Sequence, residues 1–303
     1  MKKTTKTILT TLGLLSITTY LSATYFSVNY ASKRLKKEAE PVELNDNDEL
    51  WLKQQNIKEL EITSYDQLKL KALLIEASIP TDKLIICVHG YHSNNQRQYK
   101  HMIRFFHNLG YNILLPNNRA HGNSEGQYIG FGWLDRIDII NWIYYIKDYY
   151  NKPLQIALHG ISMGGATVMC VSGEQLPKDV KCIIEDCGYT TLYKQLKHVS
   201  KYHNKRFRPF LFSSALMSKL IIGYSFFKVK PIKQVKKAYL PIMFIHGEKD
   251  DYVPASMAYQ LFKACPSKKE LLIIKNATHA TSYRTNTKLY ETRVKHFLSQ
   301  YIK

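Results

Sequence analysis

The feature that most constrains the fold is an alternation of short apolar runs with amphipathic stretches, which begins near residue 83 and continues to the C-terminus. The apolar runs have the length of strands and lie at residues 83–89, 111–116, 154–159, 180–186, 242–246 and 271–275. Helical spacing of apolar residues falls between or after them, at residues 96–109, 133–149, 163–172, 255–263 and 288–302. Continuous apolar strands separated by helices predict a mostly parallel sheet covered on both faces, the doubly wound α/β class.

Two segments depart from this alternation. Residues 58–64 and 68–75 alternate apolar and polar positions around a turn at Tyr65 and Asp66, which predicts an antiparallel hairpin before the parallel strands. Residues 190–237 are too long for a simple connection, and their apolar spacing is helical but irregular. We therefore expect one α/β domain over residues 57–303, with a helical cap inserted after the sixth strand at about residues 190–237.

The N-terminal segment carries no charged residue from position 7 to position 32. A bilayer core requires roughly 20 apolar residues of helix, so the length suffices, although Ser and Thr dilute the stretch. We favour an uncleaved membrane anchor within residues 1–32, with a cleaved signal peptide or a helix of a soluble protein as alternatives. Basic residues flank both ends and leave the orientation open, but we expect an extracytoplasmic catalytic domain at the cell membrane, or a secreted protein if cleavage occurs.

Residues 33–56 are charged and mostly lack apolar periodicity, which predicts a linker. The net charge is +19, and the whole excess lies in two segments that contain no acid. Seven basic residues precede Glu38, and twelve lie between Gly188 and Gly247. Because the charge is confined in this way and no nucleic-acid-binding module is present, we do not expect a nucleic-acid partner. The alternatives for the second cluster are attraction to anionic lipid headgroups and a solvated basic surface.

Residues 160–164 read Gly-Ile-Ser-Met-Gly and lie directly after a predicted strand and before a predicted helix. This G-x-S-x-G pattern is common by chance, but the strand, turn and helix around it are what a nucleophile elbow requires. The sharp bend forces the serine into strained backbone geometry, and the flanking glycines let strand and helix approach each other. Ser162 is therefore our predicted nucleophile, with an ordinary glycine-rich turn as the alternative.

With this motif the chain resembles the α/β-hydrolase superfamily, specifically bacterial single-domain serine esterases and prolyl-aminopeptidase-like hydrolases, from about residue 58 onward. In that family a His-Gly pair ends the strand that supplies an oxyanion donor. The resemblance implies that the backbone amides of Tyr91, after His89 and Gly90, and of Met163 form the oxyanion hole. Residues 117–126 resemble a family loop with a wide turn, which we expect to be structural, so that His121 is not the catalytic base.

The family's strand end that delivers the triad acid resembles residues 244–254, where the matching position is Asp250. Asp251 and Asp186 are the alternatives, the first through a register error and the second because some members take their acid from the earlier strand. The base is expected after the last strand, at His279, whereas His296 falls in the terminal helical pattern. The order serine, acid, histidine along the chain is the one this fold requires.

These residues predict a serine hydrolase that cleaves carboxylic esters, a carboxylesterase or lipase-like enzyme acting through an acyl-enzyme, with no metal, nucleotide or redox cofactor. The cap is aromatic and purely basic, which favours acyl or aromatic esters. The alternatives are an aminopeptidase-like or acyltransferase activity, or a non-catalytic binding protein of the same fold. An aminopeptidase needs a carboxylate for the substrate's ammonium group, for which Glu125 and Glu248 are the candidates. The five cysteines form no CxxC pair, and we expect them to be small buried hydrophobic residues.

Overall fold

The computed structural model describes residues 2–34, 46–203 and 205–303. It divides into two compact units. Unit 1 comprises Met1–Lys33 and Leu192–Val229, and unit 2 comprises Arg34–Thr191 and Lys230–Lys303. The chain therefore leaves unit 2 after Thr191 and returns to it at Lys230, so the second part of unit 1 is an insertion.

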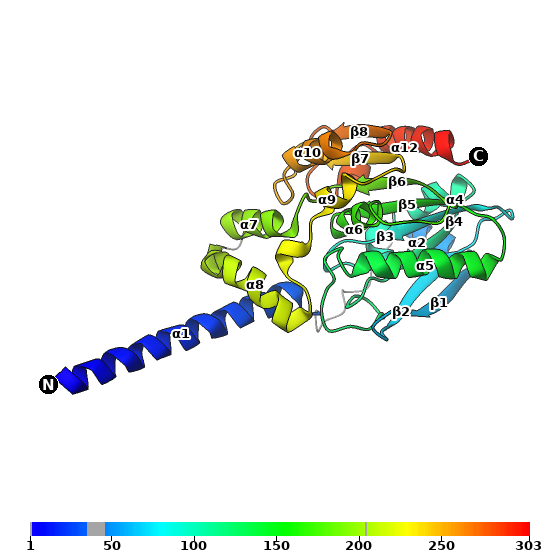
Figure 1. Ribbon diagram of the computed structural model, residues 1–303. Coiled ribbons are helices and arrows are strands. Elements are labelled where there is room, and N and C mark those ends of the chain that lie inside the picture. Colours follow the sequence, from blue (N-terminus) through cyan, green and yellow to red (C-terminus); the bar gives the residue numbers. More distant parts are fainter. Residues whose placement is uncertain (1, 35–45, 204) are drawn as a thin grey trace. The chain divides into compact units, whose positions relative to one another are not determined.

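A single twisted sheet forms the centre of unit 2 (Figure 1). Its strands are β1 (Ile57–Thr63), β2 (Lys69–Ile75), β3 (Lys83–Val88), β4 (Asn112–Pro116), β5 (Gln155–Ile161), β6 (Val180–Asp186), β7 (Ile242–Gly247) and β8 (Lys269–Ile274). They lie in the order β1-β2-β4-β3-β5-β6-β7-β8. β1 pairs antiparallel with β2 and β2 antiparallel with β4, whereas the pairs from β4 to β8 are parallel. The predicted mostly parallel sheet with an antiparallel N-terminal hairpin is confirmed.

Helices cover both faces of this sheet. In unit 2 they are α2 (Asp46–Lys53), α3 (Asn95–Tyr99), α4 (Ile103–Asn108), α5 (Asp135–Tyr150), α6 (Met163–Val171), α9 (Pro231–Val235), α10 (Ser256–Ala264), α11 (Ser282–Thr285) and α12 (Thr287–Tyr301). The strand period of two separates the core into two clusters. On β3, Leu84 belongs to the cluster that contains Trp142 of α5, and Ile85 to the cluster that contains Phe297 of α12.

Two sequence predictions differ from the structure in detail. The single helix expected at residues 96–109 is two short helices, α3 and α4, separated by a turn. The Tyr99 hydroxyl donates to the Val88 carbonyl, 3.1 Å away. This hydrogen bond holds the last residue of α3 against the end of β3, at the point where the expected helix is interrupted. The segment predicted as a linker at residues 33–56 contains α2, and its residues 35–45 lie outside the described part of the chain.

Unit 1 is helical. It contains α1 (Lys2–Ser32), α7 (Leu192–Tyr202), the 3₁₀ segment η1 (Lys205–Phe210), α8 (Leu211–Ile222) and the 3₁₀ segment η2 (Phe226–Lys228). The insertion after β6 is thus helical, as predicted, while the final part of the expected cap, α9, belongs to unit 2. Gly223 ends α8 in a left-handed conformation with φ of 80°, which costs a glycine little.

Over the described residues, no helix taken singly combines the length and the apolar character needed to cross a membrane. One bent pair of segments, Lys205–Ile222 with Phe226–Val235, meets that criterion only when the two are taken together. A membrane anchor within residues 1–32 stays a prediction.

Candidate active site

Ser162 lies at the turn between β5, which ends at Ile161, and α6, which begins at Met163. Its backbone has φ of 58° and ψ of −115°, a conformation that non-glycine residues rarely adopt and that marks functional sites. The flanking glycines are required by close packing, because a Cβ on Gly164 would overlap the Val88 carbonyl and one on Gly160 would overlap the Gly164 backbone. Backbone sterics therefore fix the serine at the tip of a sharp turn.

The side chains of Ser162, His279 and Asp250 form a hydrogen-bonded row. Ser162 Oγ lies 2.8 Å from His279 Nε2, and His279 Nδ1 lies 2.8 Å from Asp250 Oδ2. A carboxylate accepts hydrogen bonds, so Nδ1 carries the proton and Nε2 is left to accept from the serine hydroxyl. Asp250 is fully buried, whereas 22% of the His279 side chain is exposed. The structure thus brings together the predicted nucleophile, base and acid from three separate loops.

Asp250 is held as an anion by several donors. Burial alone would raise the pKa of this carboxyl, but hydrogen bonds from His246 and His279 outweigh that effect and lower its pKa to about 2. The backbone amides of Tyr252 and Val253 donate to Oδ1 at 3.0 and 2.8 Å. The acid therefore stays ionised over the range in which most proteins function.

Sequence reasoning missed two buried groups behind the acid, His246 and Glu185. His246 Nε2 donates to the Val253 carbonyl at 2.8 Å and lies 3.4 Å from Asp250 Oδ2. Burial opposes the charged imidazolium, but Asp250 and the Val253 carbonyl outweigh it, and the pKa of His246 is raised. The only available sequence signal was the His-Gly pair that ends the strand before the acid.

Glu185 is completely buried at the end of β6. Its Oε2 accepts the Gly188 amide at 2.9 Å, whereas its Oε1 and His246 Nδ1 have no hydrogen-bond partner among the residues that the structure describes. Burial is the main cause that raises the pKa of Glu185 to about 8, and Asp186 adds to it. This carboxyl is therefore protonated at neutral pH.

The alternative acids and base lie elsewhere. Asp186 accepts from Ser282 Oγ at 2.9 Å, and its carbonyl accepts the Ser162 amide at 2.8 Å. Burial is the largest cause that raises the pKa of the Asp186 carboxyl, to about 6. Asp251 and His296 are exposed, and neither makes a hydrogen bond with the His279 ring. Among the candidates, only Asp250 contacts the histidine that contacts Ser162.

The segments that carry the two predicted oxyanion donors lie beside Ser162. Met163 occupies the first position of α6, where a helix N–H has no partner within the helix. Gly90, just before Tyr91, lies so close that a Cβ there would be 3.3 Å from Ser162 Cβ. The segment that follows β3 therefore lies against Ser162. The Tyr91 ring stacks on His92 with centroids 3.7 Å apart.

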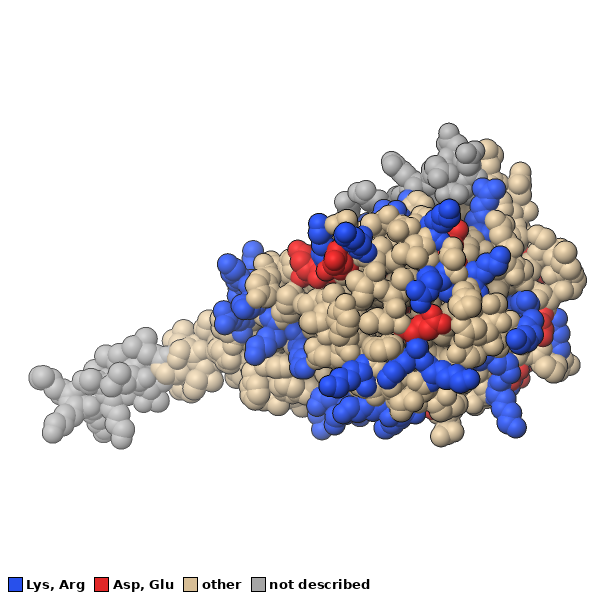
Figure 2. Space-filling model, turned by 90° about the horizontal axis from the view of Figure 1, so that it is seen from above, with Lys and Arg blue, Asp and Glu red and all other residues tan. Residues whose placement is uncertain are grey.

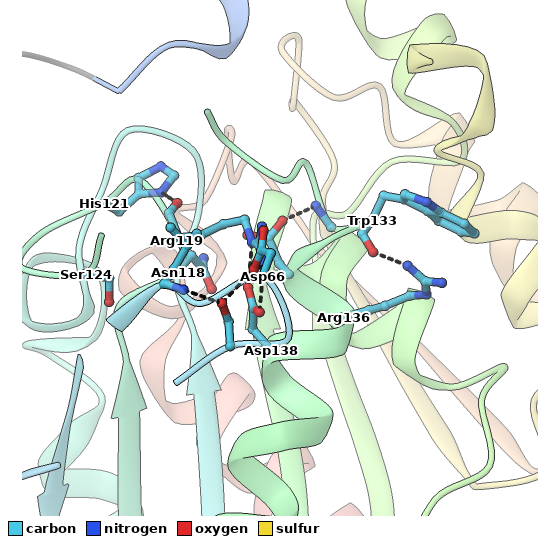
Figure 3. A network of polar contacts seen from close by, with 12 residues as sticks. Asp66, Asn118, Arg119, His121, Ser124, Trp133, Arg136 and Asp138 are labelled. Atoms are coloured by element: carbon cyan, nitrogen blue, oxygen red, sulfur yellow. Dashed lines mark hydrogen bonds and ion pairs between the residues drawn. The ribbon is translucent and has the colours of Figure 1, made fainter. Parts of the chain in front are cut away.

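The loop at residues 117–126 is tied down by polar contacts (Figure 3). None of its residues takes part in the hydrogen bonds that join Ser162, His279 and Asp250. Arg119 donates to Asp138 at 2.7 Å and to Asp66 at 2.8 Å, and the pKa of Asp138 is raised to about 7, chiefly by burial. His121 Nδ1 donates to the Arg119 carbonyl at 2.9 Å, and its Nε2 accepts the His92 amide. Burial holds the pKa of His121 well below its ordinary value. As expected, this histidine is a structural group.

The remaining polar candidates already have hydrogen-bond partners in the backbone or among Ser162, His279 and Asp250. Glu125 Oε2 accepts the Lys69 amide at 2.8 Å, and Glu248 Oε2 accepts the Asn276 amide at 3.0 Å. Over residues 2–34, 46–203 and 205–303, one group of potential metal ligands lies within 4.8 Å, namely Cys187, Asp250 and His279. Asp250 and His279 already bond to each other at 2.8 Å, so their closeness is accounted for without a metal ion. All five cysteines are buried, as predicted, and their thiols are free.

The sheet order and the serine at the turn after β5 define an α/β-hydrolase fold, which confirms the predicted fold class. Residues 96–303 match the prolyl oligopeptidase family. The chain belongs to this family and is a hydrolase of the α/β-hydrolase type. The finer resemblance to prolyl-aminopeptidase-like hydrolases is not confirmed.

The chain is also similar to individual proteins. The chain is 31% identical over 221 residues to the uncharacterized protein YqkD of Bacillus subtilis (strain 168), and the matched residues cover 72% of each chain. Its fold is similar to that of the Pyrococcus furiosus esterase Pf2001, with a TM-score of 0.71 and 23% identity over 88% of this chain and 100% of that one. A Pyrococcus horikoshii acylaminoacyl peptidase is similar over 86% of this chain and 44% of its own, with 17% identity and a TM-score of 0.64. At such identities the two solved structures show the fold alone.

Proposed function

We propose that this protein is a serine hydrolase that cleaves carboxylic esters, with Ser162 as nucleophile, His279 as base and Asp250 as the acid that orients it. The observation that carries the proposal is the row of hydrogen bonds, 2.8 Å from Ser162 Oγ to His279 Nε2 and 2.8 Å from His279 Nδ1 to Asp250. The strained turn at the serine supports it further.

The geometry suits acyl transfer. As Ser162 Oγ attacks a carbonyl carbon, His279 Nε2 accepts its proton, and the ionised Asp250 stabilises the resulting imidazolium through Nδ1. The amides of Met163 and Tyr91 would donate to the oxyanion. His279 then returns the proton to the leaving alcohol, and a water molecule releases the acid by the same steps. The exposed part of the His279 ring leaves it accessible to that water.

Esters are favoured over peptides with a free amino terminus because of the carboxylates available. The two candidate anchors for an ammonium group, Glu125 and Glu248, already accept backbone amides. The inserted segment Leu192–Val229 contains no acid. The family match makes a peptidase the second candidate, for substrates whose amino terminus is blocked and needs no such anchor.

A fluorophosphonate probe and a substrate panel test the proposal. We expect the probe to label the wild-type chain and not Ser162→Ala, and the substitution to lower ester hydrolysis by at least about 10⁴-fold. Ser172→Ala is a matched control, because Ser172 is a buried serine at the other end of α6. Labelling that survives in Ser162→Ala would contradict the assignment of the nucleophile.

The substrate class is decided by p-nitrophenyl esters of increasing acyl length measured beside aminoacyl and N-acylaminoacyl arylamides. We expect the esters to have the highest kcat/KM. Faster turnover of either arylamide would show that the protein is a peptidase and not an esterase. It would not change the proposed roles of Ser162, His279 and Asp250. An absence of probe labelling in a folded chain would favour the non-catalytic alternative.

A further inference from the structure

Unit 1 contains two helices whose exposed and buried faces are the reverse of those in a water-soluble protein. On α8 the large apolar side chains Phe212, Leu216 and Leu220 are 61%, 55% and 87% exposed. They are spaced by four residues and so form one stripe along the helix. The buried positions of the same helix include the small residues Ser214, Ala215 and Ser218. A helix in contact with water normally buries its large apolar residues and exposes its polar ones.

The C-terminal half of α1 repeats this inversion. Its buried residues are Thr24, Ser27, Val28 and Ser32, whereas the large side chains of Leu21, Tyr25, Phe26 and Tyr30 are exposed. The hydroxyls of Thr24 and Ser32 donate to carbonyls one turn earlier, so burying them leaves no unsatisfied donor. Small and hydroxyl-bearing residues facing another helix, with large apolar residues facing outward, are typical of helices that pack together in lipid.

The two helices contact each other although they are far apart in sequence. Tyr20 donates from its hydroxyl to Ser213 Oγ at 3.0 Å, and Thr24 Oγ1 lies 3.0 Å from the same oxygen. The Tyr30 ring stacks on Phe207 of η1, with centroids 4.8 Å apart. α1 is therefore joined to the inserted segment within unit 1 and is not an independent tether.

The charge of unit 1 identifies what would cover this surface. The unit has twelve Lys and Arg and no Asp or Glu. Positions 13–32 of α1 carry no charged residue, and the part of the helix next to its grey end in Figure 2 is tan, without blue or red. An apolar surface combined with exclusively basic residues fits a bilayer with anionic headgroups, where each basic residue near the surface contributes about 1 kcal/mol.

We propose that α1 and α8 together form a lipid-facing surface, here called the α1–α8 surface, that binds an anionic bilayer. Its defining residues are Leu21, Tyr25, Phe26, Tyr30, Phe212, Leu216 and Leu220. The inserted segment, and not only the N-terminal helix, then contacts the membrane. This inference goes beyond the esterase proposal and does not depend on it, because it concerns binding and not chemistry.

Vesicle flotation of the full-length chain provides the first test. Vesicles of equal parts phosphatidylcholine and phosphatidylglycerol should bind the chain at least about 10-fold more tightly than phosphatidylcholine alone. Replacing Phe212, Leu216 and Leu220 by serine should lower the partition onto anionic vesicles by at least about 100-fold. Each of these side chains is worth about 1.5–3 kcal/mol when fully buried, and about two thirds of their combined surface is still exposed without lipid, so together they contribute at least about 3 kcal/mol. The matched control replaces Ile79, Tyr144 and Tyr259, which are 77%, 50% and 53% exposed on unit 2, by serine.

A reporter on α8 separates its contribution from that of α1. Leu216→Cys carrying an environment-sensitive fluorophore should show a blue-shifted emission, quenched by lipids spin-labelled in their acyl chains, whereas Ile79→Cys should not. The native cysteines do not interfere, because all five are buried. Water-like emission from position 216 in vesicle-bound chain would overturn the proposal.

Three further outcomes would also overturn it. The first is equal binding to neutral and anionic vesicles, and the second is unchanged vesicle binding by the triple serine variant. The third is a discrete dimer of the wild type without vesicles, when the triple serine variant is monomeric but still binds vesicles. The last outcome would show that a second copy of the chain covers the surface. Far-UV circular dichroism of the same samples reports folding. Labelling by the fluorophosphonate probe is measured beside it and reports separately on the esterase proposal.

Discussion

Replacing Glu185 by glutamine should stabilise the protein at alkaline pH. The carboxyl is completely buried, its Oε1 has no partner among the described residues, and its pKa is raised to about 8, mainly by burial. Because this folded-state pKa lies above the ordinary value of 4.5, the folded chain keeps a proton that the unfolded chain releases as the pH rises. The free energy of unfolding of the wild type therefore falls between these two pH values, and glutamine, which does not titrate, avoids this loss.

The size of the effect follows from the same two values. One pH unit corresponds to 1.36 kcal/mol, so the gap between 4.5 and about 8 corresponds to about 5 kcal/mol in total. Glutamine keeps an oxygen that can accept the Gly188 amide, as Glu185 Oε2 does at 2.9 Å. We therefore expect the two proteins to have similar stability near pH 4.5, with the variant gaining about 4 kcal/mol relative to the wild type by about pH 8.

Urea unfolding followed by far-UV circular dichroism at a series of pH values measures this difference directly. Glu59→Gln, which removes an exposed carboxylate from β1, controls for the change in net charge. A stability difference that does not change with pH would refute the reasoning. It would mean that Glu185 is ionised in the folded protein and that a protonated His246 compensates its charge.

The remaining predictions concern the triad, the buried ion pair and the elbow. Asp250→Asn should leave the fold intact and lower kcat/KM for esters by about 10⁴-fold, because the imidazole loses its orienting anion. Arg119→Met should lower the free energy of unfolding in urea by about 3–5 kcal/mol, because Asp138 loses its buried partner; Arg119→Lys should lose less. Gly164→Ala should abolish both fluorophosphonate labelling and soluble expression, because the added methyl group overlaps the Val88 carbonyl.

Much of unit 2 was predictable because its strands are buried on both faces. A buried strand must be apolar throughout, so the segment around Leu84 and Ile85 was recognised from residue type alone. The position of Ser162 was equally constrained, since a serine between glycines at a strand end fits few structures. The predicted acid, Asp250, and the predicted base, His279, were chosen from the order along the chain that the fold requires, and the structure brings both side chains to Ser162.

The parts that were missed depend on contacts between distant segments. Nothing local in the sequence distinguishes Glu185 and His246 from other polar residues at strand ends. Their special character comes from complete burial on the adjacent strands β6 and β7. The contact between Thr24 and Ser213 spans 189 residues. The inversion of α8 was likewise hidden, because a helix with large apolar residues on one stripe and small ones on another has no strong polar face to indicate the solvent side.

The residues proposed for catalysis and those proposed for membrane binding lie in different units of the chain. Ser162, His279 and Asp250 all belong to unit 2, and their hydrogen bonds involve no residue of unit 1. The chain leaves unit 2 after Thr191, just beyond the end of β6, and returns at Lys230, before β7. Residues between these points can therefore change without altering the triad's hydrogen bonds. Under the two proposals, substitutions on the α1–α8 surface should change where the enzyme binds, while Ser162→Ala should change only whether it reacts.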